Sequence, residues 1–332
     1  MSGGRDDDVG KDGGTVSNNA LIETVRLKKY FPTNAGVVQA VDEVDLRINP
    51  GETLGVVGES GCGKSTLGRT IVRLYEPTDG DVLYNGKSIM ALKGKAYDEM
   101  RPNLQMIFQD PYSSLNPRMS VSQIIADPLR VYRKFKNRKE LTEKVLSTMD
   151  ACGLPPRYFN TYPHEMDGGR RQRVGLARAL ALDPKFIVCD EPVSALDVFI
   201  QAQILNQLMD LQEQKGLSYM FITHDLCVVR HISNNILVMY LGQVVEYATK
   251  EELFKHQAHP YTQALLSAIP TTDLSQRNRD RVILKGEVSN PINPDPGCRF
   301  FPRCKYADEK CKEPQTLQEI APDHFVACHN CA

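Results

Sequence analysis

The chain has 332 residues, of which 41% are hydrophobic, with 40 Lys and Arg against 41 Asp and Glu. This length predicts one large domain with an appendage, or two domains, and the hydrophobic content is enough for a real core. The net charge of -1 gives no broad positive potential for binding nucleic acid. The sequence has no long apolar run and no export signal, which predicts a cytoplasmic protein without a transmembrane helix.

The N-terminal segment differs in composition from the rest of the chain. Its residues are rich in Gly and Asp and almost devoid of large apolar side chains. Such a segment cannot bury enough apolar surface to offset the entropy lost on ordering. We therefore expect residues 1–20 to form a disordered tail.

The sequence GESGCGKST, residues 58–66, lies between an apolar run at residues 53–57 and a helix-compatible stretch at residues 67–74. This order predicts a strand, a phosphate-binding loop and a helix. The glycines let backbone N–H groups turn toward phosphate, Lys64 reaches the terminal phosphates, and the Ser65 hydroxyl ligates Mg²⁺. The expected nucleotide contacts in this motif are Gly58, Ser60, Gly61, Cys62, Gly63, Lys64, Ser65 and Thr66.

Two carboxylates follow a second buried strand, predicted at residues 186–189. They are Asp190 and Glu191, and they should lie at the C-terminal edge of the sheet, where open α/β folds bind ligands. We expect Asp190 to hold Mg²⁺ through its water shell and Glu191 to orient the attacking water. The alternative, two solvated acids in a turn, is disfavoured by the phosphate loop.

A third apolar run, residues 219–223, ends at His224. An imidazole at this edge of the sheet can contact both the γ-phosphate and Glu191. A lone histidine is more often a structural hydrogen-bonding residue. Its place after a third strand of the same sheet favours the catalytic interpretation.

Five of the nine cysteines lie in the last 35 residues, and this clustering indicates a metal or cluster site. Four thiolates suit either a tetrahedral zinc or an iron–sulfur cluster, and the spacing does not decide between them. His329 and Cys331 are alternative ligands to Cys328, and free cysteines in a tail are the alternative to any metal. The five residues are Cys298, Cys304, Cys311, Cys328 and Cys331.

Together, the nucleotide motifs resemble those of ATP-binding-cassette (ABC) ATPases, the motor subunits of ABC transporters. The resemblance implies an α/β P-loop fold with a RecA-like core, an antiparallel β subdomain and an α-helical subdomain at about residues 93–170, all within residues 21–255. It also implies that Phe31 stacks on adenine, with Tyr30 as the alternative, and that Gln109 ligates Mg²⁺ and senses the membrane partner. Asp197 falls in the loop that crosses the dimer interface.

The family's LSGGQ-like signature, which caps the ATP held by the opposite subunit, is altered in this chain. Asp167 stands in place of its serine and Arg170 in place of its glutamine, while Gly168 and Gly169 match, and a helix is expected at residues 174–182. One hypothesis is a heterodimer with a different ATPase subunit and two unequal ATP sites. The equally weighted alternative is a local ion pair between Asp167 and Arg170 that leaves the capping of ATP normal.

Longer stretches are similar to one branch of the family, the importers of oligopeptides, dipeptides and nickel. They are QDPYSSLNPR, YPHE, DEPVSALDV and HPYTQALL. That branch carries a C-terminal extension with a GCxFxxRC core, which residues 297–304 match. The resemblance implies a small metal-binding extension at residues 256–332, with a 4Fe-4S cluster, or alternatively zinc, on Cys298, Cys304, Cys311 and Cys328.

The resemblance implies an ATPase that drives the import of dipeptides or oligopeptides, with nickel or another solute as alternative cargo. Its implied partners are a second ABC ATPase subunit, two membrane permease subunits and, indirectly, an extracytoplasmic binding protein, at the cytoplasmic face of the membrane. A rival class is a soluble ABC ATPase acting on nucleic acid or the ribosome, which a single set of motifs and the near-zero charge disfavour. A subunit that binds ATP without hydrolysing it is disfavoured by Glu191 and His224.

Overall fold

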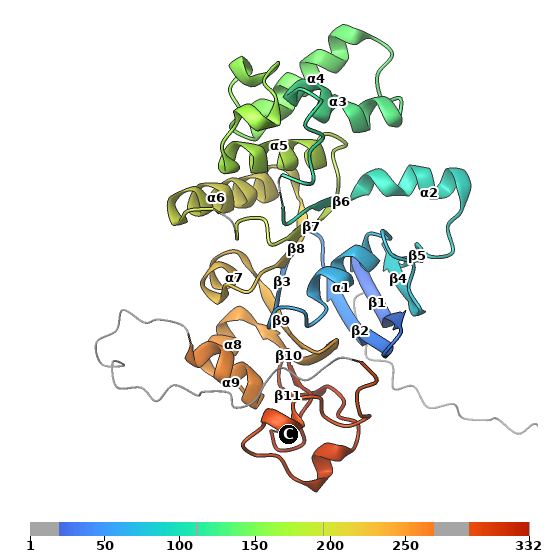
Figure 1. Cartoon of the computed structure of the whole chain (residues 1–332), viewed down its shortest axis with the longest axis vertical. Helices are drawn as coiled ribbons and strands as arrows, with labels where there is room; N and C mark the ends of the chain where they lie inside the picture. The colour runs from blue at the N-terminus through green and yellow to red at the C-terminus, as the bar shows by residue number, and fades with distance from the viewer. Residues whose placement is uncertain (1–19, 111, 195, 269–291, 332) are drawn as a thin grey trace, which may run out of the picture.

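The computed structural model describes residues 20–110, 112–194, 196–268 and 292–331 (Figure 1). The predicted disordered tail therefore lies outside the described residues, except for Ala20. A large sheet runs through the middle of the molecule, with a smaller sheet beside it, a group of helices at one end and the C-terminal segment at the other (Figure 1).

The strands form two sheets. The smaller sheet is antiparallel, in the order β2-β1-β4-β5, and contains β1 (Ile22–Thr33), β2 (Gly36–Ile48), β4 (Asp79–Tyr84) and β5 (Lys87–Ser88). The larger sheet has the order β11-β12-β10-β9-β3-β8-β7-β6. Its strands are β3 (Thr53–Val57), β6 (Leu104–Ile107), β7 (Phe186–Asp190), β8 (Ser218–Ile222), β9 (Asn235–Tyr240), β10 (Gln243–Thr249), β11 (Gln318–Ala321) and β12 (His324–Val326).

The α-helices cover the sheets and build the group of helices at one end of the molecule (Figure 1). They are α1 (Lys64–Ile71), α2 (Gly94–Met100), α3 (Val121–Val131), α4 (Arg138–Ala151), α5 (Gly168–Leu180), α6 (Val198–Lys215), α7 (Leu226–Ile232), α8 (Lys250–Lys255) and α9 (Pro260–Ser267).

The centre of the larger sheet is parallel. Strand β3 pairs in parallel with β8 and β9, β8 with β7, and β7 with β6. Strands β3, β7 and β8 are buried at every position, which explains why their sequences are continuous apolar runs rather than alternating patterns. The parallel arrangement brings the carboxyl ends of β3, β8, β7 and β6 to one edge of the sheet.

Helix α1 follows the phosphate motif and packs between the two sheets, where Leu67 and Ile71 are fully buried. It begins at Lys64 and ends at Ile71, whereas the predicted span was residues 67–74. The early start follows from Gly63, whose left-handed backbone ends the loop, so that Lys64 is already helical. The early end follows from Arg73, which adopts a φ of 55°.

Helices α3, α4 and α5 share one hydrophobic core with the end of the larger sheet that carries β6, β7 and β8. Helix α4 lies within one residue of the predicted span 139–152 at each end. Helix α5 differs more, because it begins at Gly168 and ends at Leu180, and not at residues 174 and 182. Asp167 causes the early start, since its side chain accepts a hydrogen bond from the backbone N–H of Arg170 and caps the helix.

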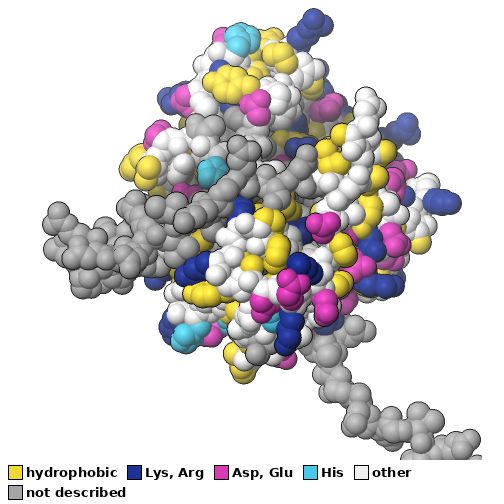
Figure 2. All heavy atoms as spheres, turned by 60° about the horizontal axis from the view of Figure 1, so that its bottom comes forward, with side chains coloured by type: hydrophobic (Ala, Val, Ile, Leu, Met, Phe, Trp, Pro, Cys, Tyr) yellow, Lys and Arg dark blue, Asp and Glu magenta, His cyan; other side chains and the backbone are white. Residues whose placement is uncertain are grey.

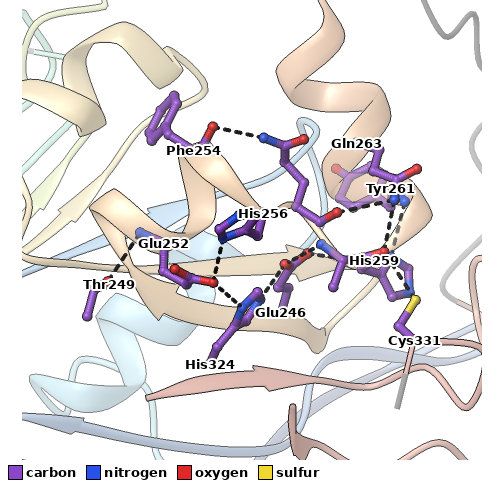
Figure 3. A network of polar contacts seen from close by, with 12 residues as sticks. Glu246, Thr249, Glu252, Phe254, His256, His259, Tyr261, Gln263, His324 and Cys331 are labelled. Carbon is purple, nitrogen blue, oxygen red and sulfur yellow. Dashed lines mark hydrogen bonds and ion pairs between the residues drawn. The ribbon is translucent and has the colours of Figure 1, made fainter. Parts of the chain in front are cut away.

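The C-terminal hairpin of β11 and β12 extends the larger sheet, because β12 pairs with β10. His324 of β12 is buried and donates from Nε2 to Glu246 Oε1 of β10 at 2.8 Å. The oxygens of the Glu246 carboxylate also accept the backbone N–H groups of Ala258 and His259, at 2.9 and 3.0 Å (Figure 3). This network joins the extension to the sheet and to the start of α9.

None of the helices in the described part of the chain combines the length and the apolar character that a bilayer-spanning segment requires.

His259 should make stability depend on pH. Its Nδ1 accepts a hydrogen bond from the Tyr261 N–H, and burial lowers the pKa of His259 from 6.5 to about 4. Between these values the unfolded chain binds a proton that the folded chain rejects, so stability falls as the pH falls. From pH 7 to pH 5 the contribution of His259 to the free energy of unfolding should drop by about 2 kcal/mol.

The measurement is urea unfolding of the wild type and of His259→Asn at both pH values. Asparagine can also accept the N–H of Tyr261 at the start of the helix, but it does not titrate. The variant should lose the His259 share of the pH dependence. An unchanged pH dependence in the variant would assign the effect to another group.

Candidate active site

Four loops meet at the carboxyl edge of the parallel strands. The phosphate loop follows β3, Gln109 follows β6, Glu191 follows β7 and His224 follows β8. Since the order of these strands is β3-β8-β7-β6, the residues come from adjacent positions along one edge. This is the edge at which an open α/β sheet binds its ligand.

Glycine is required in the phosphate loop where the chain passes other backbone atoms closely. Gly63 has a φ of 106°, and a Cβ there would lie 1.9 Å from the Ala40 carbonyl oxygen. Gly58 has a φ of 151°, and a Cβ there would lie 2.2 Å from the Met239 carbonyl oxygen. Any side chain at either position would displace the loop.

The lysine of the loop is buried and held by the loop itself. Lys64 is 5% exposed, and its Nζ donates to the carbonyl oxygens of Gly58 and Glu59 at 2.8 and 2.9 Å. The ammonium group therefore lies inside the curve of the loop, where a bound phosphate would replace carbonyl oxygens as its acceptor. Cys62 is also buried, and burial raises the pKa of its thiol, which fits a packing role better than a reactive one.

Ser65 and Asp190 contact each other directly. The Ser65 hydroxyl donates to Asp190 Oδ1 at 2.6 Å, and Arg69 Nη2 lies 3.4 Å from the other carboxylate oxygen. Asp190 is fully buried; burial raises its pKa, and the Ser65 hydrogen bond and the Arg69 charge oppose that rise. A divalent cation at this carboxylate would favour its charged form further, so the pair has the chemistry of a Mg²⁺ site.

Gln109, Glu191 and His224 form a chain of polar contacts. Gln109 Nε2 donates to Glu191 Oε2 at 3.0 Å, and His224 Nδ1 lies 3.4 Å from Glu191 Oε1. The Glu191 backbone has a φ of 45°, and its N–H donates to the Ile222 carbonyl of β8. This turn places the carboxylate between an amide and an imidazole.

Adjacent side chains of β1 point to opposite faces, and this separates the two candidates for stacking on adenine. The Tyr30 hydroxyl donates to Asp42 Oδ1. The half-buried Phe31 ring meets Tyr75 edge to face with centroids 5.7 Å apart, and Lys29 Nζ lies 5.0 Å from its centroid. Because Tyr30 is already engaged, Phe31 is the better candidate of the two.

The altered signature forms a compact helix start. Arg170 Nη1 lies 2.6 Å from Asp167 Oδ2 in an i,i+3 ion pair, and the Arg170 guanidinium carbon lies 5.1 Å from the Tyr158 ring centroid. Asp197 caps α6 in the same way by accepting the N–H of Ile200. A Cβ on Gly169 would lie 2.7 Å from Ile200, so the start of α6 packs closely on the signature.

The predicted cluster cysteines lie in the C-terminal segment, where two of them are in direct backbone contact. The Cys298 N–H donates to the Cys311 carbonyl at 2.8 Å, and burial, together with the nearby thiols of Cys311, Cys328 and Cys304, raises the pKa of Cys298 to about 11. A hydrogen bond with Cys331 lowers the pKa of Cys328.

A second set of possible metal ligands overlaps the cysteine group at Cys311. Among the described residues, one ligand atom each from Asp308, Cys311 and His329 lie within 4.8 Å of one another. His329 Nε2 is 3.0 Å from Asp308 Oδ1, and Cys311 Sγ is 3.6 Å from the same oxygen. A carboxylate, a thiolate and an imidazole are a mixed set that suits zinc.

Several residues of the site were not predicted from the sequence. Arg69 contacts Asp190, Arg303 and Tyr261 contact Glu59 of the phosphate loop, and Asp308 joins the possible metal ligands. Arg69 could have been predicted from the sequence, because it lies one helical turn after Ser65. No local sequence pattern predicts the contacts to Glu59, since they join positions more than 200 residues apart.

Two family models match the chain. Residues 41–194 match "ABC transporter", and residues 245–311 match "Oligopeptide/dipeptide transporter, C-terminal region". The oligopeptide transport ATP-binding protein AppF of Bacillus subtilis is 50% identical over 326 residues, covering 95% of this chain and 99% of that protein. OppF of Salmonella typhimurium, with the same description, is 49% identical over 318 residues, covering 93% and 95%.

The fold also matches solved ATP-binding cassettes. A dimeric structure of the cassette MJ0796, in a post-hydrolysis state bound to ADP and Pi, superposes with a TM-score of 0.64 at 28% identity. The match covers 69% of this chain and 98% of that one.

Asp167 should tolerate serine better than alanine. Both Asp and Ser accept the N–H three residues ahead, so Asp167→Ser should change the free energy of unfolding by less than about 0.5 kcal/mol, whereas Asp167→Ala should lower it by about 1 kcal/mol. Chemical denaturation of the full chain measures both effects. As a matched control, Asn137→Ala removes the cap of α4 and should cost about as much as Asp167→Ala. Equal losses in the two Asp167 variants would contradict the capping role.

Proposed function

The chain belongs to the ATP-binding subunits of oligopeptide and dipeptide ABC transporters, and we propose that it hydrolyses ATP through Glu191 and passes the resulting movement to membrane permease subunits. The observation that carries this proposal is the contact of Glu191 with both Gln109 and His224 beside the phosphate loop. Transfer of a phosphoryl group to water needs mainly positioning and charge neutralisation, and the residues at this edge provide both.

In the proposed mechanism, Phe31 stacks on adenine and the phosphate loop surrounds the phosphates. Lys64 transfers its hydrogen bonds from the loop carbonyls to the terminal phosphates. Ser65 and Gln109 would ligate Mg²⁺ and Asp190 would hold it through its water shell, and the ion would neutralise charge on the terminal phosphates. Glu191 orients the attacking water, and His224 contacts both Glu191 and the γ-phosphate.

The signature is proposed to complete the ATP site of a second ABC ATPase subunit. Asp167 to Arg170 would face the phosphates held by that subunit, and Asp197 would cross the interface. The Asp167–Arg170 ion pair supports a capped helix whose glycine N–H groups stay available to phosphate, because Arg170 neutralises the added carboxylate. A different ATPase chain remains the proposed partner, but the ion pair favours the alternative in which the signature caps ATP normally, so we do not propose that this signature weakens an ATP site.

The remaining assembly follows from the family. We propose that the subunit lies at the cytoplasmic face of the membrane on two permease subunits, through the helical subdomain of α3 to α5, and that an extracytoplasmic binding protein delivers the peptide. On the face shown in Figure 2, acidic and basic side chains are interspersed among the described residues. Such a face gives little support to the rival function on nucleic acid, which favours a basic stripe.

We also propose that the C-terminal segment holds a 4Fe-4S cluster on Cys298, Cys304, Cys311 and Cys328. The Cys298 N–H donates to the Cys311 carbonyl, and the nearby thiols of Cys304, Cys311 and Cys328 add to the rise in the pKa of Cys298, which supports a shared centre. A single zinc would need its sulfur ligands about 2.3 Å from one ion, whereas a cluster can place each thiolate on a different iron. No three of these sulfurs in the described residues meet the 4.8 Å spacing that the Asp308, Cys311 and His329 set meets, so zinc on that set is the second candidate.

Glu191→Gln should abolish turnover while leaving ATP binding intact. The amide keeps the shape of the side chain but cannot polarise water, so phosphate release by the assembled transporter should fall at least about 100-fold and ATP should remain bound. Phosphate release and retained radiolabelled ATP are the measurements. Glu213→Gln, an exposed substitution on α6, is the matched control. Hydrolysis by Glu191→Gln at the wild-type rate would remove Glu191 from its proposed role.

The metal content of the purified chain distinguishes the two centres. Anaerobic protein should contain about four iron and four sulfide per chain if the cluster is present, and Cys304→Ser should lose them. Cys227→Ser, at an exposed thiol outside the segment, should keep them. One zinc without sulfide, lost in His329→Ala and retained in Cys304→Ser, would replace the cluster with the second candidate.

A further inference from the structure

Glu59, the second residue of the phosphate loop, is held by two residues from the C-terminal part of the chain. Arg303 donates from its two terminal nitrogens to the two Glu59 carboxylate oxygens, at 2.8 and 3.1 Å. The Tyr261 hydroxyl accepts the Glu59 backbone N–H at 2.7 Å. Both the side chain and the backbone of this loop residue are therefore fixed from outside the loop.

The ion pair between Arg303 and Glu59 is largely shielded from water, and its geometry has a fixed direction. The Arg303 side chain is 7% exposed and that of Glu59 is 24% exposed. Arg303 Nη1 also lies 3.3 Å from the Tyr240 hydroxyl at the end of β9. A two-pronged pair between a guanidinium and a carboxylate fixes orientation as well as distance.

The Tyr261 contact is set by the buried network of Figure 3. Tyr261 is fully buried in α9, and its ring packs on Tyr240 and Phe300 with centroids 4.7 and 5.4 Å away. Its N–H donates to His259 Nδ1, and the His259 N–H donates to Glu246. The hydroxyl that accepts the Glu59 N–H therefore belongs to a rigid side chain.

Glu59 also connects directly to the phosphate-binding lysine, because its carbonyl oxygen accepts Lys64 Nζ at 2.9 Å. A second arginine of the same segment contacts residues that support the other side of the loop. Arg299 donates to the Leu241 carbonyl and lies 2.5 Å from Asp42, and the neighbouring Gly242 N–H donates to the Cys62 carbonyl at 2.8 Å. The segment at residues 298–304 thus contacts the loop and its immediate support.

We propose that Arg303 and Tyr261 are positioning residues for ATP binding, which hold Glu59 so that the phosphate loop keeps its phosphate-accepting shape before nucleotide arrives. The inference rests on the ATP-binding function of the subunit. A loop that is already ordered loses less conformational entropy when it binds, and this raises affinity without any new contact to the ligand. The C-terminal segment therefore helps to set nucleotide affinity although it touches no nucleotide.

Arg303→Gln should weaken MgATP binding to the full-length chain about tenfold, because the loss of the paired charge frees Glu59 and loosens the loop. The KM for ATP of the assembled transporter should rise by a similar factor, while kcat changes less than about twofold, since the reacting groups are untouched. The exchange of backbone amides at residues 58–64 should speed up before nucleotide is added.

Matched variants separate this role from a general loss of charge or stability. Lys305→Gln removes an exposed cation two residues away, whose ammonium lies over Tyr306, and should leave both affinity and exchange at wild-type values. Arg303→Lys should recover part of the affinity, because one ammonium can replace only one of the two prongs. Tyr261→Phe removes only the hydroxyl and tests the second contact if Arg303→Gln fails to fold.

A double-mutant cycle with Glu59→Gln tests the pairing itself. The double variant should lose less affinity than the two single losses combined, because the first substitution already breaks the pair. Wild-type MgATP affinity and loop exchange in both Arg303→Gln and Tyr261→Phe, or full additivity in the cycle, would overturn the proposal. Failure of the ATPase proposal would show separately, as normal turnover by Glu191→Gln with the loop exchange result unchanged.

Discussion

The parallel pairing of β9, β3, β8, β7 and β6 is the constraint on which the rest of the structure depends. Parallel neighbours end at the same edge, so the phosphate loop is brought together with the Asp190–Glu191 pair and His224, although Ser65 precedes Asp190 by 125 residues. The contact between Ser65 and Asp190 is a consequence of this alignment, and so are the contacts of Glu191 with Gln109 and His224. A change of strand order would separate the same side chains while leaving every local motif intact.

That dependence explains which parts of the site could be predicted from the sequence. Continuous apolar runs located β3, β7 and β8 to within one residue at each end, because buried parallel strands leave no polar alternation. The residue after each run then had to lie at the binding edge. The starts of α1 and α5 were placed too late, because Gly63 and Asp167 end their loops through backbone geometry and a capping hydrogen bond, which apolar periodicity does not register.

The capping role of Asp167 also changes how the altered signature is understood. Aspartate and serine differ in charge, and the carboxylate of aspartate would be repelled by a nearby phosphate. Compared by hydrogen bonding, they perform the same task, since each accepts the N–H at the third residue of the helix. The ion pair with Arg170 reduces the remaining difference in charge, so the substitution preserves the local structure of the helix start.

The contact between Arg303 and Glu59 lay beyond sequence reasoning for a different reason. It joins residues 244 apart, so only the tertiary fold brings the two side chains together. A sheltered ion pair contributes little net stability, because the cost of removing two charges from water offsets most of their attraction. The ion pair instead fixes the orientation of the carboxylate, since its two oxygens must align with the two terminal nitrogens of the guanidinium. A contact of that kind is suited to holding a phosphate loop in shape, and this is why its effect is expected in ATP affinity more than in the free energy of unfolding.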